Sequence, residues 1–277
     1  MEPDGDITRI MDINNFIDKL ICGDCLEIMP QIPDKSIDMI LCDLPYGITK
    51  CKWDKVIPFN LLWKEYNRLI KDRGAIVLTA SQPFTTKLIM SNPSMFKYCW
   101  YWQKERGTNF QTAKYMPMKV IEECVVFGKG GINYYPIMTE ITPYKHCMPA
   151  KKENSSRHMH SSGLDDSGNR IIKEYSARHP ENILKISRDN MSHNKAFHPT
   201  QKPVALFEYL IKTYTNINDI VLDNCIGSGT TAIACINTDR HFIGIEKEQK
   251  YIDIAKYRIN TLQPKLNKWI NAEEEIK

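Results

Sequence analysis

The sequence lacks any apolar run close to the roughly 18 residues that a membrane-spanning helix needs. Its amino end, MEPDGDITRIMDINN, is acidic and polar, whereas a secretory signal is basic and then apolar. We see no internal repeat, which argues against a repeat architecture. With 277 residues, 42% of them hydrophobic, the chain suits one large α/β domain or one domain with an insertion. We expect a globular protein that is neither exported nor embedded in a membrane.

The nine cysteines do not resemble a disulfide framework, because they are odd in number and scattered through apolar segments such as EECVVF and AIACI. This pattern is typical of small core residues in a reducing compartment. Cys22 and Cys25 have the spacing of half a zinc site, but a second pair of ligands with similar spacing is missing. We therefore predict that these two residues pack in the core and that the protein has no metal site.

The net charge of +4 is small, and its distribution is more informative than its size. Residues 141–197 contain ten Lys or Arg, six Asp or Glu, and five of the seven His, so the basic surplus is local. Within them, KKENSSRHMHSSGLDDSGNR has few side chains that would form a core, which is typical of an insertion or a loop region. The middle third of residues 131–197 fits a solvated linker better than an ordered subdomain.

Short apolar segments rich in Ile, Val, Tyr or Trp alternate with segments of helical periodicity. The predicted strands are residues 37–42, 75–79, 97–103, 123–127, 220–223 and 242–246. The predicted helices are residues 59–70, 84–90, 204–214, 230–237 and 250–262. This alternation predicts an α/β fold with a doubly wound, mostly parallel sheet. Residues 97–127 depart from it, and their two strand-like runs predict an antiparallel edge pair.

The stretch IVLDNCIGSGTTAIA, residues 220–234, reads as a strand, an acid, a glycine-rich turn and a helix. Gly227 and Gly229 allow a tight turn and a close approach of the backbone to a ligand, and the helix that follows offers free amides. Glu246 ends the next predicted strand, where nucleotide-binding α/β units place the carboxylate that binds ribose hydroxyls. This pattern fits a nicotinamide cofactor and S-adenosylmethionine equally well.

The stretch CDLPYG begins where the first predicted strand ends, so Asp43 would lie at the same edge of the sheet as the glycine turn. A turn built on Pro and Gly is the simplest interpretation. A chemical use is also available, because a carboxylate and a backbone carbonyl can accept both hydrogens of an exocyclic amino group and direct its lone pair at an electrophile. Pro45 would stiffen that turn, and Tyr46 would offer a face on which a base stacks.

These residues carry a family resemblance. DLPYG resembles the Asp-Pro-Pro-Tyr motif of DNA amino-group methyltransferases, DNCIGSGTT resembles their cofactor loop, and HPTQKP resembles the segment before that loop. The catalytic motif comes first, the cofactor motif comes near the end, and the basic region lies between them. This order resembles the beta class, a circular permutation of the common methyltransferase fold. The resemblance spans residues 20–262 and implies S-adenosylmethionine as cofactor and double-stranded DNA as partner.

The resemblance assigns a role to each matching position. Asp43, Leu44, Pro45 and Tyr46 would form the catalytic motif, in which Asp43 and the Leu44 carbonyl hold the target amino group. The residues that would bind the cofactor are Asp24, Cys25, Asp43, Thr200, Lys202, Asp223, Gly227, Ser228, Gly229 and Glu246. Two departures from the family stand out: Leu44 replaces the first proline, and Asn224-Cys225 replaces the usual Pro-Phe.

The family uses Asp at the first motif position mainly for adenine N6 and Ser mainly for cytosine N4, so Asp43 implies adenine. Cytosine N4 is the alternative. A nicotinamide-dependent oxidoreductase explains the glycine turn and Glu246 but not DLPYG or HPTQKP. A glutamine-amide methyltransferase would have the glycine turn before the catalytic motif, opposite to the order found. A non-catalytic DNA-binding relative is disfavoured because Asp43, Tyr46 and the glycines are all present.

The resemblance also divides the chain. It implies an extension at 1–17, a catalytic domain at 18–130 and 198–265, an inserted target-recognition region at 131–197 and a tail at 266–277. The residues expected to contact DNA are Lys104, Asn109, Lys151, Lys152, Arg157 and Arg170. A homodimer and a cognate restriction endonuclease are the further partners that the family implies. The expected location is the cytoplasm of a bacterium or of a cell infected by a phage or virus.

Overall fold

The computed structural model describes residues 10–48, 51, 54–147, 172–188 and 201–274. The chain forms two compact units, one of residues 1–135 and 182–277 and the other of Pro136–Glu181. The larger unit is built on an eight-stranded sheet, and the smaller unit contains a two-stranded sheet. Within the described residues, no helix is both long enough and apolar enough to cross a membrane.

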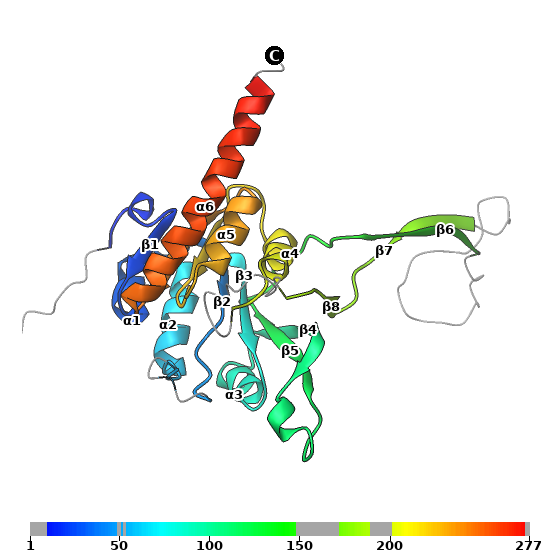
Figure 1. Ribbon diagram of the computed structural model, residues 1–277, viewed down its shortest axis with the longest axis horizontal. Coiled ribbons are helices and arrows are strands. Elements are labelled where there is room, and N and C mark those ends of the chain that lie inside the picture. Colours follow the sequence, from blue (N-terminus) through cyan, green and yellow to red (C-terminus); the bar gives the residue numbers. More distant parts are fainter. Residues whose placement is uncertain (1–9, 49–50, 52–53, 148–171, 189–200, 275–277) are drawn as a thin grey trace, which may run out of the picture. The chain divides into compact units, whose positions relative to one another are not determined.

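The eight strands of the larger unit are ordered β1-β10-β9-β2-β3-β5-β4-β8 (Figure 1). Their bounds are β1 Lys19–Cys22, β2 Ile37–Cys42, β3 Ile70–Ala80, β4 Phe96–Thr108, β5 Lys119–Phe127, β8 Ile183–Lys185, β9 Ile220–Asp223 and β10 His241–Glu246. All neighbours are parallel except β5, which runs antiparallel to both β3 and β4. The prediction of a mostly parallel sheet is confirmed. Residues 97–127 contain the predicted antiparallel pair, but its position at the edge was wrong, because the short strand β8 pairs with β4 and forms the edge.

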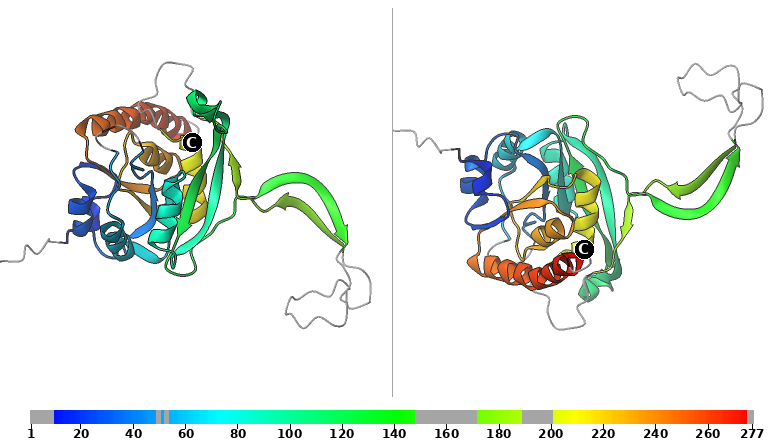
Figure 2. Two further views of the ribbon diagram at one scale, coloured as in Figure 1. Left: turned by 90° about the horizontal axis from the view of Figure 1, so that it is seen from below. Right: turned by 90° about the horizontal axis from the view of Figure 1, so that it is seen from above.

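Helices cover both faces of this sheet, as Figure 2 shows. The helices are α1 Cys25–Ile28, α2 Phe59–Leu69, α3 Phe84–Ser91, α4 Val204–Tyr214, α5 Thr230–Asn237 and α6 Gln249–Glu274, with short 3-10 turns at Ile13–Asn15, Met29–Gln31 and Phe110–Thr112. Residues of α1, α2 and α3 pack in one apolar core, and residues of α4 and α5 pack in a second. The strands therefore separate two cores, as parallel sheets with crossover helices require.

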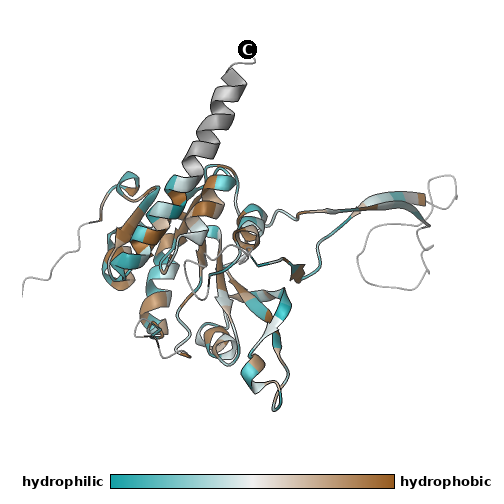
Figure 3. Ribbon diagram, in the orientation of Figure 1, coloured by the Kyte–Doolittle hydropathy of each residue, from teal (hydrophilic) through white to brown (hydrophobic). Residues whose placement is uncertain are grey.

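Successive side chains along a central strand point to opposite faces of the sheet, so they belong alternately to the two cores. In β2, Ile40 and Cys42 belong to the core with α1–α3, while Met39 and Leu41 belong to the core with α4 and α5. Each helix likewise buries one face and exposes the other, with a period of about 3.6 residues instead of two. Figure 3 shows both hydrophilic and hydrophobic residues on the helices. Burial on both faces explains why the central strands read as continuous apolar runs.

The smaller unit contains strands β6, Thr139–Cys147, and β7, Ile172–Arg178, which pair antiparallel. The rings of Tyr144 and Tyr175 stack across the pair with centroids 5.6 Å apart. The unit lies within the segment 131–197 that the sequence marks as an insertion, whereas β8 joins the sheet of the larger unit.

Candidate functional site

The site lies where the parallel strands β2, β9 and β10 end. Asp43 follows β2, Asp223 is the last residue of β9, and Glu246 is the last residue of β10. Strand β9 pairs with both β10 and β2, so segments from opposite ends of the chain meet here. Ligands of α/β sheets bind at the carboxyl ends of strands where the strand order reverses. A cavity of about 750 Å³ opens at this edge and is lined by residues of both halves.

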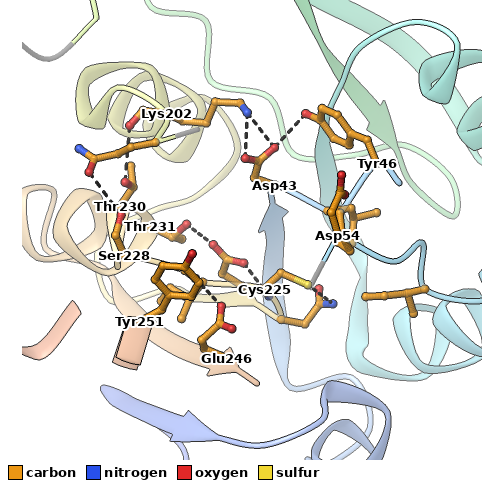
Figure 4. Close-up of a pocket in the computed structure, with 18 of the residues that line it drawn as sticks. Asp43, Tyr46, Asp54, Lys202, Cys225, Ser228, Thr230, Thr231, Glu246 and Tyr251 are labelled. Carbon is orange, nitrogen blue, oxygen red and sulfur yellow. Dashed lines mark hydrogen bonds and ion pairs between the residues drawn. The ribbon is translucent and has the colours of Figure 1, made fainter. Parts of the chain in front are cut away.

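Asp43 is held from three sides in this cavity (Figure 4). The Lys202 Nζ atom donates to both carboxylate oxygens, at 2.9 Å to Oδ1 and 2.8 Å to Oδ2. The Tyr46 hydroxyl donates to Oδ1 at 2.8 Å, and the Thr79 hydroxyl donates to the same oxygen. These contacts fix the carboxylate in one orientation. Oδ1 accepts from three donors, whereas Oδ2 accepts from Lys202 alone and keeps a lone pair for a further donor.

Tyr46 contributes both its ring and its hydroxyl. The ring stacks on Phe84 with centroids 4.9 Å apart, and Lys202 Nζ lies 5.6 Å from the ring centroid. Burial, reinforced by the Asp43 carboxylate, raises the pKa of Tyr46 well above its ordinary value, so the hydroxyl remains a donor at neutral pH. The sequence predicts the stacking face but not the hydrogen bond to Asp43.

Lys202 also connects Asp43 to a second ion pair. Its Nζ atom lies 3.4 Å from Glu122 Oε2, and Lys104 Nζ donates to Glu122 Oε1. Burial opposes the charge on Lys202, but Asp43 and Glu122 outweigh it and raise the pKa of the ammonium group. Burial likewise works against the Glu122 carboxylate, but the two lysines prevail and lower its pKa. The result is a row of alternating charges, which we call the buried charge row: Lys104, Glu122, Lys202 and Asp43.

The turn after Asp43 is held by Asp54, a residue without a predicted role. Its side chain is 7% exposed, and it accepts hydrogen bonds from the amides of Gly47 at 2.8 Å and Ile48 at 3.0 Å. Gly47 has φ +68°, a left-handed conformation that favours glycine. Leu44 and Pro45 line the cavity in this turn, and the Leu44 side chain is buried. Asp54 therefore sets the path of the predicted catalytic motif.

The glycine turn connects β9 to α5 as the sequence predicts. Gly227 and Gly229 have φ +50° and +85°, and a Cβ atom on Gly229 would lie 2.8 Å from the Ala255 Cβ atom in α6. Arg258, also in α6, donates to the Ser228 carbonyl at 2.7 Å and to the Ser228 hydroxyl at 2.9 Å. The turn is thus held from its outer side by α6, while Gly227 and Ser228 line the cavity.

Asp223 is almost fully buried beneath this turn, with 3% of its surface exposed. It accepts hydrogen bonds from the Thr231 hydroxyl and, at 3.0 Å, from the amide of Cys225. Burial raises its pKa to about 7 despite these donors. Asp223 therefore lines the floor of the cavity and holds the turn at the same time.

Glu246 and Asp24 line the other end of the cavity, and both also make structural hydrogen bonds. Glu246 accepts from the amides of Gly227 at 3.0 Å and Glu248 at 2.9 Å, and burial raises its pKa. Asp24 caps helix α1 through the amide of Leu26 and accepts from Lys247 Nζ at 2.9 Å, a bond that lowers its pKa. Their geometry fits carboxylates that are pre-positioned to accept hydrogen bonds from a ligand.

Two cysteines from distant parts of the chain meet beside these carboxylates. Cys25 begins α1, is buried as predicted and lines the cavity together with Cys225, which precedes the glycine turn. The prediction that Cys22 also packs in the core was wrong: it is exposed, because it ends the edge strand β1. A hydrogen bond with Cys225, together with burial, raises the pKa of the Cys25 thiol, which keeps it neutral. Within the part of the chain that the structure describes, no cluster of His, Cys, Asp or Glu is suited to hold a metal ion.

The residues expected to contact DNA have different positions. Lys104 lines the cavity but is 6% exposed, and its ammonium group is engaged with Glu122. Asn109 is exposed at the cavity rim. Five predicted site residues lie outside the described residues: Lys151, Lys152, Arg157, Arg170 and Thr200.

A cavity at the strand ends of a doubly wound sheet, with a glycine turn on one side and a fixed carboxylate beside an aromatic ring on the other, defines an α/β enzyme of the nucleotide-cofactor type. The model of the N6/N4 DNA methylase family matches residues 37–257 of this chain. The chain belongs to this family of DNA methyltransferases, whose members use S-adenosylmethionine.

Curated relatives support this assignment over most of the chain. The type II methyltransferase M.HinfI of Haemophilus influenzae is 30% identical over 292 aligned residues, which cover 92% of this chain and 72% of that protein. The type II methyltransferase M1.MboII of Moraxella bovis is 26% identical and covers 89% of this chain and 98% of that protein.

Solved structures agree with the observed fold. The complex of M1.HpyAVI with S-adenosylmethionine has 26% identity and a TM-score of 0.57, and the alignment covers 87% of this chain and 98% of that one. The cytosine-N4-specific PvuII DNA methyltransferase has 17% identity and a TM-score of 0.61, with 87% and 85% of the two chains covered, and shows the fold alone.

The residues of the cavity fit S-adenosylmethionine. A Cβ atom on Gly227 would meet only one neighbouring atom, the Cys225 carbonyl oxygen at 3.9 Å, so this turn leaves room beside it. The carboxylates of Asp24, Asp223 and Glu246 suit a ligand with a positive charge, ribose hydroxyls and amino groups. The opposite wall carries Asp43 and Tyr46, so a cofactor on the glycine turn and a base on the ring would share one cavity.

Proposed function

We propose that this enzyme methylates N6 of adenine in DNA. The observation that carries the proposal is the position of Asp43. This residue directly follows β2, is fixed by Lys202, Tyr46 and Thr79, and faces the same cavity as the glycine turn. Asp at this position is typical of the adenine-N6 members of the family, as described above. The proposed residue roles follow from this arrangement.

In the proposed mechanism, Asp43 and the main-chain carbonyl of Leu44 accept the two hydrogens of the adenine amino group. The nitrogen lone pair is then directed out of the plane of the base, where it acts as a nucleophile. Bound S-adenosylmethionine supplies a methyl group on a positively charged sulfur. Tyr46 stacks on the extruded base, which returns roughly 1–3 kcal/mol of the few kcal/mol that extrusion costs. The amino group loses one proton to Asp43 or to water after it has formed the new bond.

Lys202 has a different role from the one that the resemblance alone implies, which is contact with the methionine end of the cofactor. In the structure its ammonium group binds Asp43 directly. We propose that it holds the Asp43 carboxylate in its orientation until the base enters. Positioning and charge complementarity would then supply the catalysis, without a metal ion.

The order of the motifs supports a circularly permuted, beta-class arrangement. The strand with Asp43 precedes the strand with the glycine turn in the chain, although the two strands are adjacent in the sheet. We propose that the segment 131–197 between them recognises the DNA target, with Lys151, Lys152, Arg157 and Arg170 as phosphate contacts. A homodimer, a cognate restriction endonuclease and a cytoplasmic location in a bacterial or infected cell are part of the same proposal.

The test is to incubate the protein with S-adenosylmethionine and mixed-sequence unmethylated DNA, digest the DNA to nucleosides and identify the product by mass spectrometry. We expect N6-methyladenine from the wild-type protein and none from Asp43→Ala, which should still bind the cofactor. N4-methylcytosine would overturn the assignment of the base. Substantial activity of Asp43→Ala would remove Asp43 from the mechanism.

A further inference from the structure

We infer that the β4–β5 hairpin inserts side chains into the DNA duplex beside the extruded base. The inference rests on the proposed function and concerns residues 106–119, which we call the hairpin tip. Figure 1 shows the hairpin extending from the sheet and ending in a short helical turn, Phe110–Thr112. The two aromatic residues at the tip are Phe110 and Tyr115.

The first observation is exposure of large apolar side chains. Phe110 is 82% exposed and Tyr115 is 87% exposed, and Met116 and Met118 are also exposed. By contrast, the aromatic residues Trp100 and Trp102 farther back in the same hairpin are buried. A concentration of exposed apolar residues rimmed by polar ones marks an interaction site. Phe and Met are among the side chains that proteins insert between base steps.

The second observation is charge. The tip carries three cationic residues, Arg106, Lys114 and Lys119, and residues 106–120 contain no Asp or Glu. Lysine is depleted in protein–protein interfaces, whereas a cationic surface suits the phosphate backbone. Cations that flank exposed aromatic rings match a nucleic acid, which offers phosphates outside and flat bases inside.

The third observation is position. Thr108, Asn109, Lys119 and Ile121, at the base of the tip, line the same cavity as Asp43 and Tyr46. Asn109 has φ +67° and directly precedes Phe110, so the chain turns sharply between the cavity rim and the first exposed ring. The Lys119 ammonium group donates to the Gln82 carbonyl at 3.2 Å, which ties the base of the tip to the loop before α3. The tip is therefore attached at the place where a base would leave the duplex to reach Asp43.

The chemistry of base extrusion explains why such a tip is useful. An extruded base leaves a gap in the stack and an unpaired partner, which costs free energy. A ring inserted into the gap restores stacking and offsets part of that cost. Tyr46 stabilises the base inside the cavity, and Phe110 and Tyr115 would stabilise the duplex that the base has left.

The test compares two substrates built on the target sequence, which is identified by sequencing an undigested portion of the methylated DNA. One is a fully paired duplex, and the other has an abasic site opposite the target base, so that extrusion is already easy. We expect the double variant Phe110→Ala/Tyr115→Ala to lose about tenfold or more in kcat/KM on the paired duplex and under about threefold on the abasic one. Ile217→Ala removes an exposed apolar side chain outside the hairpin and the cavity lining, and should change neither value.

Three results would overturn the inference: equal activity of the double variant and the wild type on the paired duplex, equal loss on both substrates, or conversion of a dimer to a monomer in sedimentation. The last result would identify the tip as a contact between two copies of the chain. Calorimetry with S-adenosylmethionine should give the same dissociation constant for the double variant as for the wild type. If the wild-type protein methylates no DNA, the proposed function fails first, and that failure is visible before any variant is compared.

Discussion

At the scale of single residues, the buried charge row couples two ion pairs that the sequence separates widely. Lys202 is 7% exposed and lies between Asp43 and Glu122. Removing one partner of a buried pair leaves an uncompensated charge and typically costs 3–5 kcal/mol. Here two carboxylates would face each other without the cation between them.

We expect Lys202→Met to lower kcat by about 100-fold, because Asp43 loses the donor that fixes its orientation and misplacement of a reacting group costs about that factor. The dissociation constant for S-adenosylmethionine should change much less. Turnover measured beside calorimetry separates the two effects, with Lys212→Met as a control on the exposed surface of α4. If the variant weakened S-adenosylmethionine binding by the same factor as it lowered kcat, Lys202 would be a cofactor-binding residue, as the resemblance alone implies.

Asp223 makes a pH-dependent contribution to stability. Its pKa is about 7 in the folded protein against an ordinary value of 3.8, so the folded state retains a proton that the unfolded state has lost. Stability from this group is present below about pH 4 and is lost as the pH rises toward 7, at up to about 1.4 kcal/mol per pH unit.

Asp223→Asn should remove this dependence. We expect the free energy of unfolding of the variant, relative to the wild type, to rise by about 2–3 kcal/mol between pH 5 and pH 8. Urea unfolding of both proteins at several pH values measures the difference. A constant difference across this range would mean that Asp223 is already ionised at pH 5.

At the scale of elements, the glycine turn is limited by the helix behind it. Gly229→Ala should destabilise the protein by more than the 1–3 kcal/mol of a left-handed non-glycine residue, because its Cβ atom would also press on Ala255. Two variants serve as controls. Gly227→Ala also places alanine at a positive φ but brings no contact with Ala255, and Gly130→Ala brings neither a positive φ nor a close contact. Thermal unfolding should show the largest loss of stability for Gly229→Ala, a smaller loss for Gly227→Ala and the smallest for Gly130→Ala. Equal losses for Gly229 and Gly227 would show that α6 yields to the new atom.

Elements with a clear periodicity were predictable from the sequence. The predictions for α4, α5 and β9 match the observed bounds, because a full helical stripe or a wholly apolar strand lies between polar turns. Strands β1 and β8 were missed because they are only four and three residues long and partly exposed, too short to show a period. Helix α6 extends to Glu274, past the predicted end at 262, because Pro264 lies directly beyond that end and a proline inside a helical pattern predicts that the helix stops.

The candidate site was predictable where one local motif carries several functional groups. Asp43 and Tyr46 share one motif, and Gly227, Ser228 and Gly229 share another. Their supporting residues were not predicted: Thr79, Glu122, Asp54 and Arg258. Thr79 lies on β3 and Glu122 on β5. The sequence pattern of a strand indicates which of its faces are buried, but it does not indicate which residues of other strands its polar side chains will contact.

At the scale of the whole molecule, the chain segments on either side of the smaller unit are each hydrogen-bonded to the larger unit, so we expect the smaller unit to be removable between them. The Tyr135 amide donates to the Thr213 carbonyl at 2.7 Å, and the Tyr101 amide donates to the Asn182 carbonyl at 2.8 Å. Residues 136–181 between them form a unit of their own. The sheet and the cavity of the larger unit should therefore persist when a short Gly/Ser linker replaces them.

We expect this deletion to retain binding of S-adenosylmethionine within about twofold, because no residue that lines the cavity is removed. DNA methylation should be lost, together with most of the salt-sensitive DNA affinity. Calorimetry with the cofactor and a filter-binding titration at two salt concentrations test this expectation. Unchanged methylation of the same sites would place target recognition elsewhere in the chain.

The pairing of β1 with β10 has a consequence for how the protein is made. Strand β1 leaves the ribosome before the other strands of the sheet, and its partner residues, such as Ile245 for Ile21, emerge more than 200 residues later. At about 5–20 residues per second, β1 waits roughly 10–45 s without its neighbour. The half that carries Asp43 is synthesised before the half that carries the glycine turn. The nascent chain therefore presents its proposed catalytic motif before it can bind the methyl donor, and we expect activity to begin only after β10 has joined the sheet.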